Sequence, residues 1–480
     1  MSHLEFHTGK STENEGRHEM LKDDGWEVEH DSALLGRNTR CAMLQSVSIS
    51  HLITLLALLV QGLSGASTQE APASPPPMGD SSWALGLRLY QTLRSESGAL
   101  NTLFSPLLLA SSLGALGRGA GGTTAKQLHD LLQTPTFSKK PGQAGELAGG
   151  LQSLSEANGT SFRLHSSSAV FSKQGPQLSE GLMKESKGKF GLKHQTLGQG
   201  DSKRDLKQFH AWAKESMGGV EGAPLRGEIQ TKTGALVVAN ALHFKGLWER
   251  EFNEDTSDLR TFLGAKYTKV PMMHRAGRPL FHASLFQLCI VFFSPHTHPP
   301  TPHRHYEDVE NMVQVLELGL WGGGASVVLL MPFHVESLAR LDKLLSLDLL
   351  AKWLNHTSST SVAISLPRAN LSSTLSLQKQ LSALGLTDAC DQKTADFSGA
   401  FGKNQGNLHL GGVLHWASLE LGSEAGQGAA ELGDEIVEKK PKVFYADHSF
   451  VVLVRDNSTG VLLLLGAVDL VEGEALHDEL

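Results

Sequence analysis

Three side chains near the C-terminus have a spacing that could bring one acidic and two largely apolar groups onto a common surface. Val443, Tyr445 and Asp447 are two residues apart, so in a β-strand all three side chains point to one face. That face would present a carboxylate beside an apolar pad. A carboxylate suits a guanidinium group, because two parallel N–H···O bonds fix orientation as well as charge. Spacing alone leaves other roles open: Asp447 as an N-cap or loop carboxylate, and Tyr445 as a core residue.

A histidine, His448, directly follows this acidic residue. Imidazole has an unperturbed pKa of about 6.5 and therefore changes charge close to neutral pH. Protonation of His448 would place a cation beside the carboxylate of Asp447. The competing interpretation is a structural histidine that satisfies a hydrogen bond.

Residue combinations typical of enzymes and metal sites are missing from the sequence. It has no Gly-x-Ser-x-Gly motif, no ordered Ser-His-Asp set and no paired catalytic carboxylates. The glycine-rich run at residues 117–122 follows a predicted helix rather than a strand, which indicates a turn and not a phosphate loop. The three cysteines, Cys41, Cys289 and Cys390, are too few for a zinc site or a disulfide framework. We therefore expect no enzyme activity, no cofactor and no metal.

The overall charge and hydropathy exclude two further classes. Lys and Arg number 42 and Asp and Glu number 50, a formal net charge of −8, whereas a nucleic-acid-binding surface needs a basic bias. No run reaches the roughly 18 apolar residues that cross a bilayer. The sequence thus predicts neither nucleic-acid binding nor membrane insertion.

Both ends of the chain carry targeting patterns. Residues 43–66 join a short apolar core to small residues, which is typical of a secretory signal peptide. A Pro-rich linker, residues 67–82, follows and argues against a buried helix. Residues 1–42 form a polar extension, so we expect translation to start at Met43. The last four residues, His477, Asp478, Glu479 and Leu480, spell HDEL, the address for retention in the endoplasmic reticulum.

Four acceptor sequons for N-glycosylation fit this lumenal route. They lie at Asn158, Asn355, Asn370 and Asn457. Each is weak evidence individually, because the tripeptide is short.

The body of the chain, residues 83–471, is patterned as one α+β domain. Helices are predicted over residues 83–94, after Ser105 with Pro106 at the first helical position, and from Ser202, where Ser202 and Asp205 suggest a capping box and Gly218-Gly219 a stop. The apolar run at residues 235–239 predicts a central strand, and residues 362–366 alternate. Residues 450–468 predict a hairpin around Asn457-Ser-Thr-Gly.

One segment, residues 278–303, breaks this pattern. An apolar stretch runs into a tract of Pro and His with neither helical nor strand periodicity. Its four histidines suggest metal, but histidines separated by prolines lack the fixed spacing of a specific site. We interpret the segment as an atypical insertion that need not belong to the native protein.

Several separated blocks resemble the serpin superfamily. They include NTLFSPLLLASSLGALGRGAGGTTAKQL at residues 101–128, ANALHFKGLWEREF at 239–252, ADFSG at 395–399 and FYADHSF at 444–450, in family order. The resemblance implies three β-sheets, eight or nine helices and an exposed reactive-centre-like loop ahead of the C-terminal strands.

The signal, the HDEL tail and the block YADHSFVVLVRD together resemble the clade H branch of that family, the collagen-specific chaperones of the endoplasmic reticulum. The resemblance implies that Asp447 accepts the Arg of an X-Arg-Gly triplet in triple-helical procollagen, that Tyr445 and Val443 flank it, and that Lys232 is a secondary contact. This branch has Leu at position 443, Arg at 232 and Pro at 449. It also implies a monomer, the retention receptor as a partner, and release at lower pH, with His274, His334 and His415 as sensors beside His448.

Two further interpretations stay open. Inhibitory serpins insert a loop of small residues into the central sheet, but here Gly422, Gly426 and Gly428 each carry a strand penalty of about 0.5–1 kcal/mol relative to Ala. A lumenal inhibitor of serine-type endopeptidases is therefore the less favoured alternative. A paralogue with weakened collagen binding is the other, because Lys232, Val443 and Ser449 depart from the branch.

Overall fold

The computed structural model describes one compact unit within residues 73–480. The described residues are 81–96, 101–132, 142–173, 184, 186–188, 190–198, 201–225, 229, 231, 234–276, 303–401, 408–427 and 441–476. The predicted extension, signal peptide, HDEL tail and Lys232 lie outside these residues. So do residues 428–440 of the predicted exposed loop and all of the insertion except His303.

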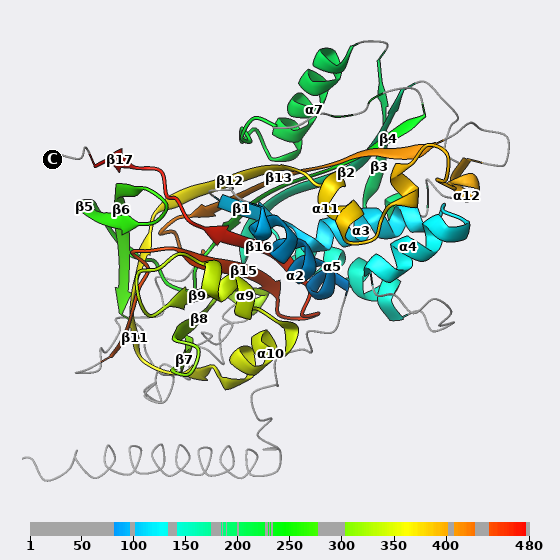
Figure 1. Cartoon of the computed structure of the whole chain (residues 1–480). Helices are drawn as coiled ribbons and strands as arrows, with labels where there is room; N and C mark the ends of the chain where they lie inside the picture. Colours follow the sequence, from blue (N-terminus) through cyan, green and yellow to red (C-terminus); the bar gives the residue numbers. More distant parts are fainter. Residues whose placement is uncertain are drawn as a thin grey trace, which may run out of the picture. The chain divides into compact units, whose positions relative to one another are not determined.

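The largest sheet has seven strands in the order β1-β16-β15-β9-β8-β7-β10. The hairpin predicted around Asn457 is confirmed: β15 and β16 pair antiparallel and lie between β1 and β9. Figure 1 shows α2, α3 and α5 beside these two strands, which they contact. The strands are β1 (Asn101–Phe104), β7 (Arg304–Asp308), β8 (Val313–Gly319), β9 (Ala325–Pro332), β10 (Ser358–Ser359), β15 (Phe450–Asp456) and β16 (Leu462–Val468).

A second sheet has five strands in the order β12-β13-β4-β2-β3. The apolar run predicted as a central strand is confirmed, since β4 is the middle strand and is buried almost throughout. It pairs in parallel with β13, and α7 packs over β2 and β4 (Figure 1). The strands are β2 (Phe162–Lys173), β3 (Leu192–Leu197), β4 (Ala235–Gly246), β12 (Ala369–Ser376) and β13 (His409–Leu421).

The third sheet carries the predicted cation site. Its strand order is β14-β11-β6-β17, with β5 paired to β6. The alternating residues 362–366 form β11, as predicted, and β14 lies beside it in parallel at the sheet edge. The strands are β5 (Asn253–Leu263), β6 (Tyr267–Ala276), β11 (Val362–Pro367), β14 (Lys442–Tyr445) and β17 (Glu474–Ala475).

Nine α-helices lie in the described part of the chain. The predicted start of α3 is confirmed: the Ser105 hydroxyl accepts a hydrogen bond from Leu108 N, and Pro106 occupies the first helical position. The helices are α2 (Ser81–Ser95), α3 (Pro106–Gly117), α4 (Gly122–Leu132), α5 (Gly142–Ala157), α7 (Ser202–Ser216), α9 (Ala339–Leu344), α10 (Leu347–His356), α11 (Gln378–Ala383) and α12 (Ser398–Phe401).

Two helix starts differ from the sequence prediction. The cap of α7 is Asp201, whose Oδ1 accepts from Arg204 N at 3.0 Å, so the predicted Ser202–Asp205 capping box is wrong. Asp205 is buried and pairs with Lys173 Nζ at 2.8 Å instead. Helix α2 begins at Ser81, two residues inside the segment that we assigned to the linker.

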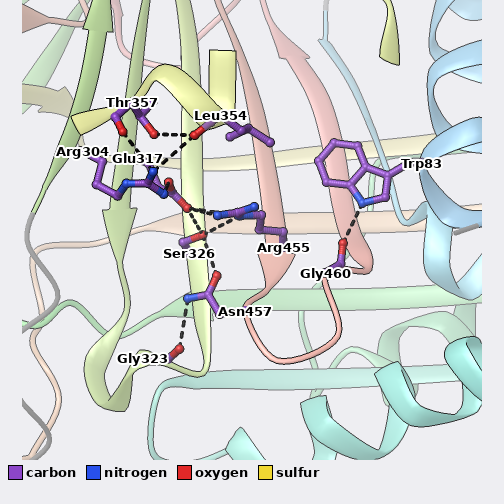
Figure 2. A network of polar contacts seen from close by, with 10 residues as sticks. All are labelled: Trp83, Arg304, Glu317, Gly323, Ser326, Leu354, Thr357, Arg455, Asn457 and Gly460. Carbon is purple, nitrogen blue, oxygen red and sulfur yellow. Dashed lines mark hydrogen bonds and ion pairs between the residues drawn. The ribbon is translucent and has the colours of Figure 1, made fainter. Parts of the chain in front are cut away.

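A buried polar network joins the seven-stranded sheet to α10 (Figure 2). Glu317 on β8 accepts from Arg304 Nη1 at 3.0 Å and from Arg455 Nη2 at 2.6 Å. Arg304 Nη2 also donates to the carbonyl of Thr357 at 2.9 Å. Ser326 Oγ donates to Glu317 Oε1 at 2.8 Å. The carboxylate is thus the only anion that these network contacts place between the two guanidinium groups.

Removal of this carboxylate should destabilise the fold. Glu317→Ala would leave two cations facing a buried space, which typically costs about 3–5 kcal/mol. The free energy of unfolding from denaturant titration tests this expectation. The control is Glu310→Gln. The exposed carboxylate of Glu310 lies 3.8 Å from Lys352 Nζ, and its loss should change the free energy of unfolding by only about 0–1 kcal/mol. Equal stability of the two variants would contradict the assignment.

Arg275, three residues before the atypical insertion, contacts His303, its last residue. Arg275 Nη2 lies 3.4 Å from Nδ1 of His303, and its guanidinium stacks 4.4 Å above the Phe252 ring. The entropic cost of closing a loop changes slowly with its length. We therefore expect the domain to fold when residues 278–302 are replaced by a short Gly-Ser linker. The melting temperature should be unchanged or higher. A large loss of folded protein would show that the segment is integral to the domain.

Candidate functional site

The three residues of the predicted site point to one face of β14 and its continuation. The side chains between them, Phe444 and Ala446, are fully buried, whereas Val443 is 60% exposed. Tyr445 is half-buried, and the side chain of Asp447 is 31% exposed. Asp447 lies two residues beyond the end of β14, yet the alternation continues through it. The structure therefore brings the predicted carboxylate and its apolar neighbours together.

A row of polar side chains extends this face across the sheet. Tyr445 is in register with Ser365 on β11, and Ser365 with His274 on β6. His274 Nδ1 lies 2.8 Å from Ser365 Oγ, and its Nε2 lies 2.8 Å from Asp258 Oδ2. Asp258 in turn pairs with Arg260 Nε at 2.6 Å.

This row influences the titration of two of its members. The hydrogen bond from His274, together with Arg260, lowers the pKa of Asp258. Burial raises the pKa of Tyr445, and it is opposed by the charge of Arg260 and assisted by those of Asp447 and Asp258. We name the face formed by Val443, Tyr445, Asp447, His274, Asp258 and Arg260 the acidic face.

The ring of His448 is enclosed between two hydrogen-bond acceptors. Nδ1 lies 2.8 Å from Asp447 Oδ1, and Nε2 lies 3.0 Å from the carbonyl oxygen of Pro332. Neither acceptor carries a hydrogen while Asp447 is ionised, so both contacts are satisfied only when the ring is doubly protonated. Burial by itself lowers the pKa of His448, but these two hydrogen bonds and the charges of Asp447 and Glu336 together raise it above the ordinary value.

The remaining predicted sensors have different surroundings. His415 is fully buried, its Nε2 accepts from Ser105 N at 2.9 Å, and burial lowers its pKa to about 3. It therefore stays neutral at any pH of the secretory pathway, and we do not retain it as a sensor. His334 is exposed on the turn after β9. His274 belongs to the acidic face itself.

Among the described residues, Arg260 is a cation that the structure places on this face; the predicted contact Lys232 lies outside the described residues. Arg260 is exposed on β5 and is close enough to influence the titration of Tyr445. Sequence analysis missed it, along with Asp258. The available signal was the spacing of two between these residues, which puts opposite charges on one strand face.

The four predicted glycosylation residues differ in how much of the side chain is free. Asn355 and Asn370 are exposed on α10 and β12. Asn158 is also exposed, but its amide nitrogen donates to the Leu164 carbonyl at 2.9 Å. Asn457 is half-buried in the network of Figure 2, where its amide nitrogen donates to Gly323 O and its Oδ1 lies 3.0 Å from Ser326 Oγ.

The residues that lead into the predicted loop are held against β4 and its continuation. Trp248 donates through Nε1 to the Gly422 carbonyl at 2.7 Å and through its backbone N to Glu424 O at 3.0 Å. Gly426 N donates back to Trp248 O at 2.9 Å. A Cβ on Gly426 would collide with the Trp321 side chain. Gly426 is therefore required for this docked conformation.

In the described ranges, no helix combines the length and the apolar character needed to span a membrane. Within the same residues, no cluster of three His, Cys, Asp or Glu side chains could hold a metal ion.

Similar proteins were found by sequence. Serpin H1 from mouse is 31% identical over 405 residues, which cover 84% of this chain and 90% of the relative. Serpin H1 from cattle is 30% identical and is covered over 99% of its length, with 89% of this chain. Serpin B10 from cattle is more distant, at 26% identity with 79% of this chain and 96% of the relative covered.

Solved structures share the fold. Uncleaved ovalbumin covers 82% of this chain and 99% of its own, with a TM-score of 0.66 and 19% identity. The mouse protein-Z-dependent protease inhibitor gives a TM-score of 0.67 at 20% identity, with 82% and 97% covered. The family model "Serpin (serine protease inhibitor)" matches residues 80–469, nearly all of the body predicted from sequence. The chain therefore belongs to the serpin family.

Proposed function

We propose that this serpin is a non-inhibitory chaperone of the endoplasmic reticulum that binds triple-helical procollagen through its acidic face. The observation that carries the proposal is Asp447, a partly exposed carboxylate that follows the exposed Val443 and the half-buried Tyr445 on the same face. The similarity to Serpin H1 and the resemblance to the clade H branch support the assignment.

The chemistry of the ligand matches this face. A collagen triple helix buries Gly at its axis and presents only X and Y side chains, so a binding protein must recognise those. An Arg at the Y position would extend its guanidinium to Asp447, with the apolar part of the side chain against Val443 and Tyr445. Arg260 offers a counter-charge for an acidic side chain elsewhere on the same rod.

The pair of Asp447 and His448 supplies a physical reason for release at lower pH. When the ring of His448 is protonated, Oδ1 of Asp447 is held by an imidazolium at 2.8 Å. Only Oδ2 then remains for a guanidinium, and the carboxylate already has a counter-charge. Since the folded pKa of His448 is raised above its ordinary value of about 6.5, the protonated ring predominates below that pH. Ligand binding and protonation therefore oppose each other.

Retention by the HDEL tail, residues 477–480, and glycosylation at Asn355 and Asn370 complete the proposal. The tail would return the chaperone from later compartments after release. Both asparagines are exposed, so a glycan on either one meets no packing conflict at the side chain itself.

Asp447→Asn should abolish most collagen binding, because it leaves a guanidinium without its counter-charge. Breaking a desolvated pair of this kind costs about 2–5 kcal/mol, or roughly 30-fold or more in Kd. Titration calorimetry at pH 7.5 with a triple-helical X-Arg-Gly peptide and its X-Ala-Gly counterpart tests this.

The matched control is Asp391→Asn, an exposed acid beyond η3 (Asp388–Cys390), which should bind like the unmodified protein. Equal affinity for the Arg and Ala peptides would contradict the proposal. An SDS-stable adduct with a serine protease would instead favour the inhibitor alternative.

His448→Gln should weaken the pH dependence of binding. The unmodified protein is expected to lose at least tenfold in affinity between pH 7.5 and 6, whereas the glutamine variant should lose less than threefold. Calorimetry of the Arg peptide at both pH values measures this.

His334→Gln and His274→Gln are tested beside it, because both residues stay candidates for sensing. A full pH response in His448→Gln, with a reduced one in either of the others, would move the sensor to that residue.

A further inference from the structure

One face of α7 carries a row of lysines that faces away from the core. Lys203, Lys207 and Lys214 are exposed, and their spacing in an α-helix places them within about 40° of one another around the axis. The row is about 16 Å long. Phe209 and Ala213, on the opposite side of the helix, are buried, and Figure 1 shows α7 on the outer side of the five-stranded sheet. We name these three side chains the lysine row.

The stability of the helix does not account for the first half of this row. Lys203 is the second residue of α7 and is followed by Arg204, although cations in a first turn face the positive end of the helix dipole. Lys203 and Lys207 are also like charges at i and i+4, a spacing at which they repel each other. The helix therefore carries these cations at a cost to its own stability, which indicates a role in binding.

Two carboxylates at the start of α7 are already engaged elsewhere. The Asp201 side chain caps the helix by accepting from Arg204 N at 3.0 Å. Asp205 is buried, and its Oδ2 lies 2.8 Å from Lys173 Nζ. Neither Lys203 nor Lys207 has an ion-pair partner among the residues that the structure describes. Their charges are thus available to a ligand.

The opposing charges gather at the other end of the helix. Glu215 is exposed beside Lys214, and Lys214 Nζ lies 3.6 Å from Glu221 Oε2, with side chains that are 52% and 82% exposed. Solvent screens an ion pair as exposed as this one. Lys214 is therefore only weakly held and can turn to a ligand along the same row.

The edge of the sheet beside α7 adds further positive charge. Leu197 on the edge strand β3 packs with Phe209 of α7, and the exposed Lys193, four residues earlier, points to the same face of the sheet. Residues 183–214 contain eight Lys or Arg and three Asp or Glu, whereas the whole chain has a formal net charge of −8. Positive charge is thus concentrated at α7 and β3.

We propose that the lysine row and Lys193 bind a linear sulfated polysaccharide. A polymer that carries sulfate groups along its length matches a row of ammonium groups, because each ammonium is a point charge that needs no fixed orientation of its partner. The site lies on the five-stranded sheet and is separate from the acidic face on the third sheet. The inference therefore goes beyond the proposed function.

The surroundings of the row favour this polymer over two other polyanions. A membrane surface would need apolar side chains beside the cations, and in the described part of the chain none of the large exposed apolar residues lies on α7 or on the five-stranded sheet. A nucleic acid would need exposed aromatic rings for stacking. Trp212 of α7 is half-buried, with its ring against Phe171 and Trp416.

Titration calorimetry of the full chain with a sulfated heparin octasaccharide tests the proposal. We expect binding at about 50 mM NaCl that weakens at about 150 mM, because salt screens the ammonium charges, and no binding of the desulfated octasaccharide. The variant that combines Lys203→Gln, Lys207→Gln and Lys214→Gln should lose at least tenfold in affinity. Gln and Lys have similar helix propensities, so the helix content from circular dichroism should not change.

The matched control removes three exposed lysines elsewhere on the molecule. It combines Lys266→Gln, Lys269→Gln and Lys393→Gln, which changes the net charge by the same amount, and it should alter the affinity by less than twofold. Equal losses in the two triple variants would show that binding follows net charge alone and would overturn the site.

Other ligands and a second variant complete the test. The absence of octasaccharide binding at low salt would overturn the inference, and so would equally tight binding of polyglutamate or of anionic phospholipid vesicles. The lysine-row variant should bind the Arg-containing collagen peptide like the unmodified protein, and Asp447→Asn should bind the octasaccharide unchanged. The failure of this inference and the failure of the proposed function are therefore distinguishable.

Discussion

One imidazole ring, that of His448, ties the acidic face to the protonation state of the protein. Both nitrogens of His448 face acceptors, Asp447 Oδ1 on one side and the Pro332 carbonyl on the other. A neutral ring can donate to only one of them. The number of satisfied hydrogen bonds, and with it the stability of this arrangement, therefore changes whenever the ring gains or loses a proton. The carboxylate that we assign to guanidinium recognition is therefore coupled to pH through a direct hydrogen bond.

The rest of the sheet keeps that carboxylate in place. The buried side chains of Phe444 and Ala446 hold β14 and its continuation against the core, and Leu263 N donates to the Asp447 carbonyl at 2.6 Å. Asp447 thus has a fixed backbone and a partly exposed side chain, an arrangement that favours recognition of a rigid rod without ordering cost.

Short sequence patterns predicted those elements that are determined by neighbouring residues. Ser105-Pro106 predicted the start of α3, and the apolar run beginning at Ala235 predicted a buried central strand. The cap of α7 was predicted wrongly because Asp205 forms an ion pair with Lys173, a residue distant in sequence, and does not cap the helix. Arg260 was missed for a similar reason. Its charge influences Tyr445 across the sheet, from β5 past β6 and β11 to β14, and spacing along the chain does not reveal this strand order.

The most direct measurement of the central claim is the pKa of His448 itself, followed by NMR of its ring with and without a triple-helical peptide. If a guanidinium occupies Asp447, the peptide that contains Arg should lower that pKa by about one unit, which corresponds to tenfold coupling. The peptide with Ala in place of Arg should leave it unchanged. An identical titration of His448 in the free protein and in a saturated complex with the Arg peptide would contradict the account.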